Sequence, residues 1–233
     1  MIVWVASYPR SASKLTMLTL DRAFGFKRAL SSQPDRTRDR FGIRPEAELL
    51  PTLAELDEPI FLKTHALPEQ GDESPVLYLI RDGRDAVVSH AHYVLDRGKR
   101  SFKGLDFTAA LERIIRRGHA VKARPGQVPP GVTWSDHVRF WTSHPAPTAL
   151  VRFEELIRDP PAVISGALRS LSVDVPEPKG EVPSFEELRT TRDPVVYRRG
   201  AAGAWKDEMP APLEALFWEL HGSQMEALGY PRG

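Results

Sequence analysis

The chain has 233 residues, of which 27% are charged and 41% hydrophobic, so it is long enough for a full core and has an ordinary globular composition. Its formal net charge is only +1, which argues against a nucleic-acid partner bound by bulk electrostatics and means that any anion site must be a local cluster of cations. The absence of cysteine excludes disulfides, thiolate metal sites and a cysteine nucleophile, and no apolar run is long enough to cross a bilayer.

The first predicted elements are a buried strand and a helix. Residues 2–8 form a short run of apolar, β-branched and aromatic side chains, and Pro9 should end the strand because proline cannot donate to a central ladder. The helix is expected to begin at Lys14, with Ser11 or Ser13 as its N-cap. The apolar side chains that fit one face of this helix are Leu15, Leu18 and Phe24.

A basic loop joins this strand to this helix. It carries Arg10 and Lys14 together with the hydroxyl groups of Ser11, Ser13 and Thr16. Two cations beside the free N–H groups of a helix N-terminus suit an anionic phosphate group. The loop is not a Walker A loop, because it contains no glycine. A basic surface turn without a ligand is the alternative interpretation.

Strands and helices alternate along the rest of the chain. Residues 31–44 form a polar surface loop. Further strands are predicted at 59–65, 75–80 and 149–153, further helices at 46–56, 83–95, 107–120, 134–143, 160–171 (capped by Asp159) and 209–228, and irregular segments at 125–131 and 176–183. The alternation indicates a single α/β domain, residues 1–233, whose mainly parallel sheet has helices on both faces. Ligands of such sheets bind at the carboxyl ends of the strands.

A histidine follows a lysine at the end of the second predicted strand, in the sequence Lys63-Thr64-His65. A histidine in this place can remove a proton from a hydroxyl group while the lysine neutralises a leaving anion. A structural histidine with satisfied hydrogen bonds is the alternative.

Arg81 and Ser89 are candidate phosphate ligands. Arg81 leaves the strand at 75–80, and Ser89 lies about two turns into the next helix, on the side that faces back towards the strand. An arginine and a hydroxyl group held on rigid elements make a good phosphate clamp. Arg84 and Asp85, which lie between them, are expected to form local ion pairs.

A late loop is the fourth polar stretch. It contains Arg198 and Arg199 next to Gly200, with Gly203 three residues further on. Two arginines and two glycines can surround a phosphate group with side-chain and backbone donors. An exposed basic loop is the alternative interpretation.

These four stretches together resemble the sulfotransferases that use 3′-phosphoadenosine 5′-phosphosulfate (PAPS). The similar segments are, in the order of the family, Tyr8-Pro9-Arg10-Ser11 in the 5′-phosphosulfate loop, Lys63-Thr64-His65 in the catalytic motif, Arg81 with Ser89 in the 3′-phosphate motif, and Arg198-Arg199-Gly200 with Gly203 and Trp205-Lys206 in the C-terminal segment. Shorter likenesses occur at 134–137, 152–156, 184–185 and 228–230, so the resemblance spans nearly the whole chain.

The resemblance implies a P-loop-like three-layer fold and a sulfuryl transfer from PAPS to an acceptor hydroxyl, with 3′-phosphoadenosine 5′-phosphate (PAP) as product. It implies that His65 is the general base and that Lys63 and Arg10 stabilise charge on the bridging oxygen and the 5′-phosphate. The residues that it assigns to the donor are Arg10, Ser11, Ala12, Ser13, Lys14, Arg81, Ser89, Arg198, Arg199 and Gly200, with Phe185 stacked on adenine. No metal is implied, because cationic side chains take that role.

The first loop departs from the family pattern of Ser-Gly-Thr-Thr-Trp. Ala12 replaces the glycine that lets the backbone approach phosphate, Lys14 replaces a hydroxyl residue, and Leu15 replaces the aromatic residue that stacks on adenine. A lysine at a helix start faces the unfavourable end of the helix dipole. We therefore expect Lys14 to reach the 5′-phosphate or the sulfonate group. The alternative is that Lys14 points into solvent.

Two other functions stay open from the sequence. One is a non-catalytic or altered nucleotide-binding protein of the same fold, and the other is a P-loop-type kinase, against which the missing Gly-Lys-Ser/Thr motif argues. For a sulfotransferase we expect a small-molecule hydroxyl acceptor and a cytoplasmic location, with no nucleic-acid or membrane partner. The identity of the acceptor and a homodimeric state are left open.

Overall fold

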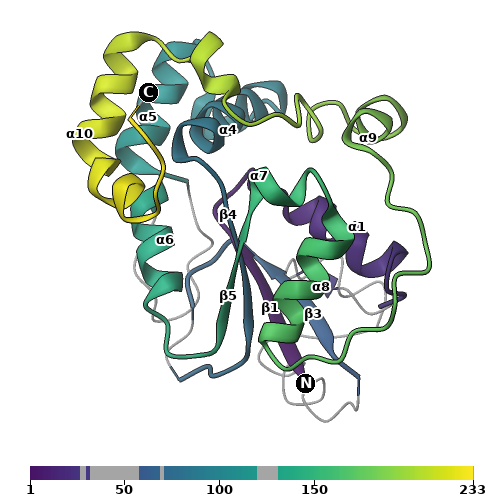
Figure 1. Ribbon diagram of the computed structural model, residues 1–233. Coiled ribbons are helices and arrows are strands. Elements are labelled where there is room, and N and C mark those ends of the chain that lie inside the picture. The colour runs from purple at the N-terminus through teal and green to yellow at the C-terminus, as the bar shows by residue number, and fades with distance from the viewer. Residues whose placement is uncertain (27–29, 32–57, 69–70, 120–130, 233) are drawn as a thin grey trace. The chain divides into compact units, whose positions relative to one another are not determined.

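The computed structural model describes residues 1–26, 30–31, 58–68, 71–119 and 131–232 (Figure 1). The predicted helix at 46–56, and nearly all of the predicted loops at 31–44 and 125–131, lie outside the described residues. Contacts divide the chain into two units, and each is described by itself. Unit 1 contains Met1–Ser7, Ala12–Leu79 and Thr142–Val182, and unit 2 contains Tyr8–Ser11, Ile80–Trp141 and Pro183–Gly233.

The sheet of unit 1 is centred on its first strand. Its described strands are β1 (Ile2–Ser7), β2 (Leu30–Ser31), β3 (Ile60–Thr64), β4 (Val76–Ile80) and β5 (Thr148–Arg152), in the order β2-β3-β1-β4-β5. β1 pairs in parallel with β3 and with β4, and β2 pairs in parallel with β3. Every residue of β1 and β4 is buried, which explains why these strands are continuous apolar runs rather than alternating ones. The predicted α/β class with a mainly parallel sheet is confirmed.

The three parallel strands β1, β3 and β4 end at the same edge of the sheet. Ala6 is in register with Thr64, and Ser7 is in register with Leu79. The chain therefore leaves these strands at neighbouring points, although the strands lie far apart in the sequence. In unit 1, the stretch Lys63-Thr64-His65 lies at the end of β3, as expected for ligand-binding residues of a parallel sheet.

The described helices of unit 1 are α1 (Ser13–Arg22), α7 (Phe153–Leu156) and α8 (Pro160–Ser170). α1 packs against β1, β3 and α8, and α8 also packs against β5. The predicted cap of α8 is confirmed, because the Asp159 side chain accepts a hydrogen bond from the Ala162 N–H. α7 was not predicted, and Phe153, which we expected in a strand, is its first residue.

The predicted N-cap of α1 is wrong. The cap residue is Ala12, and no side chain there accepts a hydrogen bond from the first turn. Ser13 is already the first helical residue, one position before the expected start at Lys14. The reason lies in the backbone, because Ala12 adopts the left-handed conformation with φ 67° and ψ 21° rather than the extended conformation of an ordinary N-cap.

Unit 2 is mainly helical. Its elements are α4 (Gly83–Asp96), η1 (Arg100–Phe102), α5 (Phe107–Arg117), α6 (Trp134–Thr142), α9 (Phe185–Thr191), η2 (Ala204–Asp207) and α10 (Ala211–Ala227). α4 packs against α5 and α10. Gly83 makes this packing close, since a Cβ there would lie 2.5 Å from the Phe217 ring and 2.8 Å from the Trp134 ring. Among the described residues, no helix is long and apolar enough to span a membrane.

Most predicted helices of unit 2 differ from the observed ones only at their ends. α5 stops at Arg117 because Gly118 follows with φ 66°, three residues before the predicted end. α10 starts at Ala211, after Pro210, rather than at 209. α9 was not predicted at all, although Ser184 and Glu187 form a capping box at its start.

Candidate functional site

The loop after β1 carries Arg10, whose half-buried guanidinium has neutral hydrogen-bond acceptors among the described residues. Arg10 Nε donates to Ser89 Oγ at 3.1 Å, and Nη2 donates to the carbonyl oxygens of Val195 at 3.1 Å and Val196 at 2.7 Å. Ser11 follows, and its buried Oγ has no hydrogen-bond partner among the described residues. A half-buried cation whose described hydrogen bonds all go to neutral acceptors, beside an unsatisfied hydroxyl, indicates a place where an anion is expected.

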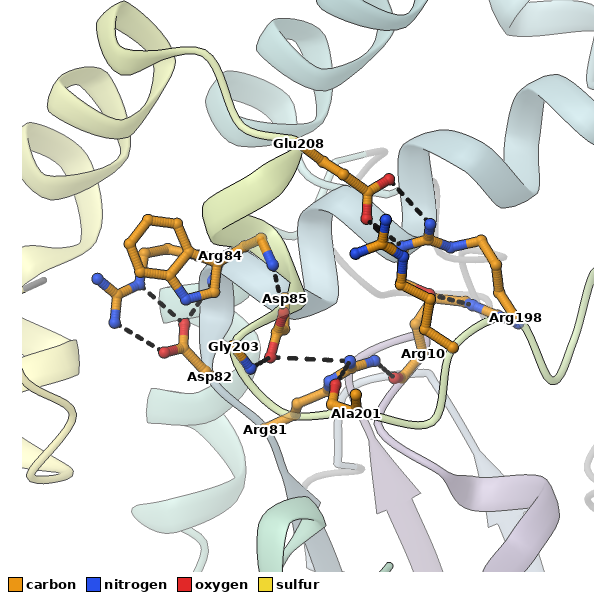
Figure 2. A network of polar contacts seen from close by, with 12 residues as sticks. Arg10, Arg81, Asp82, Arg84, Asp85, Arg198, Ala201, Gly203 and Glu208 are labelled. Carbon is orange, nitrogen blue, oxygen red and sulfur yellow. Dashed lines mark hydrogen bonds and ion pairs between the residues drawn. The ribbon is translucent and has the colours of Figure 1, made fainter. Parts of the chain in front are cut away.

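Arg81 fastens this loop to the late loop of unit 2. Its Nη1 donates to the carbonyl oxygen of Arg10, and its Nη2 donates to that of Ala201, both at 3.1 Å (Figure 2). Asp85, one turn further along α4, lies 3.8 Å from Arg81 and accepts the N–H groups of Gly203 at 2.7 Å and Trp205 at 2.9 Å. The backbone of the late loop is therefore held by Arg81, which precedes α4, and by Asp85 in the first turn of α4.

Three guanidinium groups act on one another in unit 2. Burial, together with the positive charges of Arg81 and Arg198, lowers the pKa of Arg10 to about 10. Burial also raises the pKa of Asp85, although Arg81 and two backbone N–H groups oppose this effect. A bound anion near Arg10 would relieve the repulsion between the three cations.

Arg198 and Arg199 share a carboxylate partner, Glu208. Arg198 contacts both oxygens of Glu208, with Nη1 to Oε2 at 2.8 Å and Nη2 to Oε1 at 3.0 Å. Arg199 Nε lies 3.4 Å from Oε1, and His92 Nε2 lies 2.6 Å from Oε2. Burial alone would raise the pKa of Glu208, but the hydrogen bonds from Arg198 and His92 outweigh it and the pKa is lowered.

Phe185 and Gly200 lie against each other. Gly200 has φ 63°, and a Cβ at this position would lie 2.2 Å from Cδ1 of the Phe185 ring. The ring also meets Tyr197 edge-on, with 5.4 Å between the ring centroids. The aromatic residue expected to stack on adenine and the glycine expected near the 3′-phosphate are thus in direct contact, and glycine is required by both the conformation and the space.

In unit 1, His65 is oriented by the end of β1. Its Nδ1 lies 2.8 Å from the carbonyl oxygen of Ser7 and 3.2 Å from Ser7 Oγ. A carbonyl oxygen only accepts, so Nδ1 carries the proton, and the neutral imidazole has its lone pair on Nε2. Lys63 lies on β3 in register with Val5, and its side chain is half-buried.

The remaining loop residues start α1 in unit 1. Ala12 is the cap, and Ser13 is the buried first residue of the helix. Lys14 follows with an exposed side chain. Both Arg10, with φ 76°, and Ala12 have positive φ without being glycine, so the loop holds two residues in a conformation that costs L-amino acids free energy.

A buried aromatic cluster adjoins Arg10 in unit 2. The Tyr8 ring meets the rings of His90, His119 and His137 edge-on, with centroid separations between 5.0 and 6.1 Å. Burial lowers the pKa of His90 well below its ordinary value, and His119 and Arg10 add to this effect. His90 is therefore neutral at pH 7.

Arg84 forms the local ion pair that the sequence predicts. Its guanidinium donates to both oxygens of Asp82, from Nε at 3.1 Å and from Nη2 at 2.7 Å. Its central carbon also lies 3.9 Å from the centroid of the Trp205 ring. Asp85 pairs with Arg81 as expected, but its two bonds to the late loop could not be read from the sequence.

The structure brings several predicted residues together within unit 2. Arg10, Ser89 and Arg81 are linked by hydrogen bonds, Phe185 contacts Gly200, and Arg199 joins Arg198 at one carboxylate. Sequence reasoning missed Glu208 and His92. The only signal for them was their closeness along the chain to Lys206 and Ser89.

A profile of the sulfotransferase domain matches residues 3–229. Similar solved structures include mouse sulfotransferase SULT7A1 complexed with PAP, which is 18% identical with a TM-score of 0.66 over 97% of this chain and 84% of that chain. The sulfotransferase domain of the Synechococcus PCC 7002 olefin synthase is 17% identical (TM-score 0.51, 100% and 95% covered), and that of the curacin biosynthetic pathway is 14% identical (TM-score 0.54, 100% and 98% covered). These likenesses concern the fold alone. No curated protein sequence matches the chain.

Proposed function

The chain belongs to the sulfotransferase domain family, and from this premise we propose that it transfers a sulfuryl group from PAPS to a hydroxyl group of a small-molecule acceptor. The choice of donor rests on the cluster of Arg10, Arg81 and Arg198 in unit 2. Arg81 donates a hydrogen bond to the carbonyl oxygen of Arg10, and the charges of Arg81 and Arg198 lower the pKa of the Arg10 guanidinium. This local positive charge stands out in a chain with a net charge of only +1.

The residues of unit 2 fit a nucleotide with a phosphate group at its 3′ position. Two buried donor atoms, Ser11 Oγ and Arg198 Nε, have no hydrogen-bond partner among the described residues, and phosphate oxygens would satisfy both. The guanidinium groups supply charge-assisted donors for such oxygens. Because Gly200 has no side chain, the backbone of its loop passes directly beside the Phe185 ring. We assign this ring to stacking on adenine.

His65 is the general base of the proposed reaction. Its Nδ1–H donates to the carbonyl oxygen of Ser7, which fixes the tautomer in which Nε2 can take the proton of the acceptor hydroxyl. The donor supplies an activated sulfur whose bond to the 5′-phosphate oxygen breaks as the acceptor oxygen bonds to it. Lys63 and Arg10 stabilise the negative charge that is left on the 5′-phosphate.

The test is a transfer assay with sulfur-labelled PAPS against a panel of phenols, sugars and tyrosine peptides. His65→Ala should lower turnover about 10²–10⁴-fold, the usual contribution of a general base, and leave PAP affinity nearly unchanged. His144→Ala is the matched control, because His144 lies in a surface turn of unit 1 where its Nδ1 accepts the Ala146 N–H.

Two outcomes would contradict parts of the proposal. Wild-type turnover in His65→Ala would remove His65 from the mechanism. Tight PAP binding by the wild type, with no labelled product from any acceptor in the panel, would favour the non-catalytic nucleotide-binding alternative.

A further inference from the structure

Glu208 is the point where three side chains of unit 2 meet. Its side chain is 13% exposed, and its two oxygens contact Arg198, Arg199 and His92. These partners come from separate segments, since His92 lies on α4 and the two arginines precede η2. The ring of His92 is fixed in turn by Phe107, with 4.5 Å between the ring centroids. The carboxylate is therefore held in place independently of any ligand.

The contact between Glu208 and Arg198 uses only one side of the guanidinium group. Both Nη atoms point their hydrogen bonds at Glu208, as Figure 2 shows. The remaining donor, Nε, is buried and has no hydrogen-bond partner among the described residues. A guanidinium has a second bidentate edge formed by Nε and one Nη atom, and this edge matches the spacing of two phosphate oxygens. The free edge is the part of Arg198 that a ligand would satisfy.

We propose that Glu208 is a positioning residue for the nucleotide's 3′-phosphate: it binds the Nη end of Arg198 and so presents the Nε edge to the phosphate. The inference rests on the proposed function, which assigns the 3′-phosphate to Arg198. Glu208 itself does not touch the nucleotide. An arginine that is already held loses less side-chain entropy when a ligand binds, which is how an outer carboxylate increases affinity.

Asp207 provides a matched control one residue away. It pairs with Arg199 Nη1 at 3.1 Å, but its side chain is 74% exposed, so the pair is screened by solvent. Asp207→Asn and Glu208→Gln remove the same charge from neighbouring positions of the chain. Only the second change removes the carboxylate that orients Arg198, and glutamine keeps the shape of glutamate.

The experiment measures the affinities of PAP and of AMP, which lacks the 3′-phosphate, by calorimetry. Glu208→Gln should weaken PAP binding about tenfold, as expected for an outer-shell carboxylate, and change AMP binding less than about twofold. Asp207→Asn should leave both affinities within about twofold of the wild type. A melting temperature near that of the wild type confirms that the variant is folded, and Glu208→Asp, which keeps the charge but shortens the side chain, should fall between wild type and Glu208→Gln.

The results separate this inference from the function on which it rests. If the wild type binds PAP no more tightly than AMP, the assignment of a 3′-phosphate site is wrong. If the wild type prefers PAP but Glu208→Gln keeps the same preference, the site stands and Glu208 has no positioning role. Tighter PAP binding by Glu208→Gln would show that the carboxylate competes with the phosphate, which also overturns the inference.

Discussion

Replacing Ala12 with glycine should make the protein more stable, because Ala12 caps α1 in the left-handed conformation. Its φ of 67° and ψ of 21° bring the Cβ of an L-residue close to a backbone carbonyl oxygen, and glycine has no Cβ. Alanine is also a poor N-cap, and glycine is a better one. The substitution Ala12→Gly removes both disadvantages and leaves every described side-chain hydrogen bond in the loop intact.

The expected gain follows from two opposing contributions. A left-handed L-residue costs about 1–2 kcal/mol relative to the right-handed conformation. Glycine also raises the conformational entropy of the unfolded chain, and this lowers the free energy of unfolding by about 0.4–1 kcal/mol. The net stabilisation is therefore about 0.5–1 kcal/mol, which for a chain of 233 residues raises the melting temperature by about 1–4 °C.

Urea denaturation and thermal melting of Ala12→Gly measure this gain directly. Ala215→Gly is the control, because Ala215 is exposed in the interior of α10, where the same substitution should destabilise by about 1 kcal/mol. Opposite signs for the two variants are the expected result. Equal destabilisation by both would refute the reasoning, since it would mean that Ala12 pays no conformational cost in the folded protein.

Two further predictions concern charge and pH. Lys14→Thr should weaken PAPS binding about three- to tenfold, with a smaller difference at high salt because screening weakens an ion pair; unchanged or tighter binding would show that the exposed Lys14 is not a ligand. Burial, together with the nearby His119 and Arg10, lowers the pKa of His90. Below about pH 6.5 the unfolded chain therefore binds a proton at His90 that the folded protein does not, and the free energy of unfolding decreases as the pH is lowered. Between pH 7.5 and 5.5 this contributes a loss of about 1 kcal/mol, which urea denaturation should find in the wild type and not in His90→Gln; an equal loss in both would exclude His90 as the cause.

The sequence predicted the elements whose signal is local. β1 and β4 could be recognised because strands buried on both faces need unbroken apolar runs, and the cap of α8 could be recognised because Asp159 needs only the next three residues. α9 was missed because only Leu188 of its seven residues is buried, so it has no apolar periodicity to read. The cap of α1 was misassigned because a positive φ at alanine has no sequence signal.

The sequence predicted which motifs contribute residues to the candidate site, but it did not predict which side chains contact one another. Arg81 and Ser89 were expected to act together, but each contacts Arg10, a residue that belongs to another motif. Arg198 was expected to be available to a phosphate, and its Nη end is instead bound by Glu208. Such pairings depend on how segments far apart in sequence fold together, which composition and spacing do not determine. The roles of His65 and Lys63 stay predictions until the assays above are done.

The hydrogen bonds that hold the late loop have a consequence for how the protein folds. Arg81 and Ala201 are 120 residues apart, and Asp85 and Gly203 are 118 residues apart. Closing a flexible loop of this length costs about 4 kcal/mol of chain entropy, which only the completed set of contacts can offset. We therefore expect these contacts to form late in folding, after the sheet of unit 1. A nucleotide that binds only the completed loop would shift the folding equilibrium towards the folded protein. The refolding yield should therefore rise with PAP concentration.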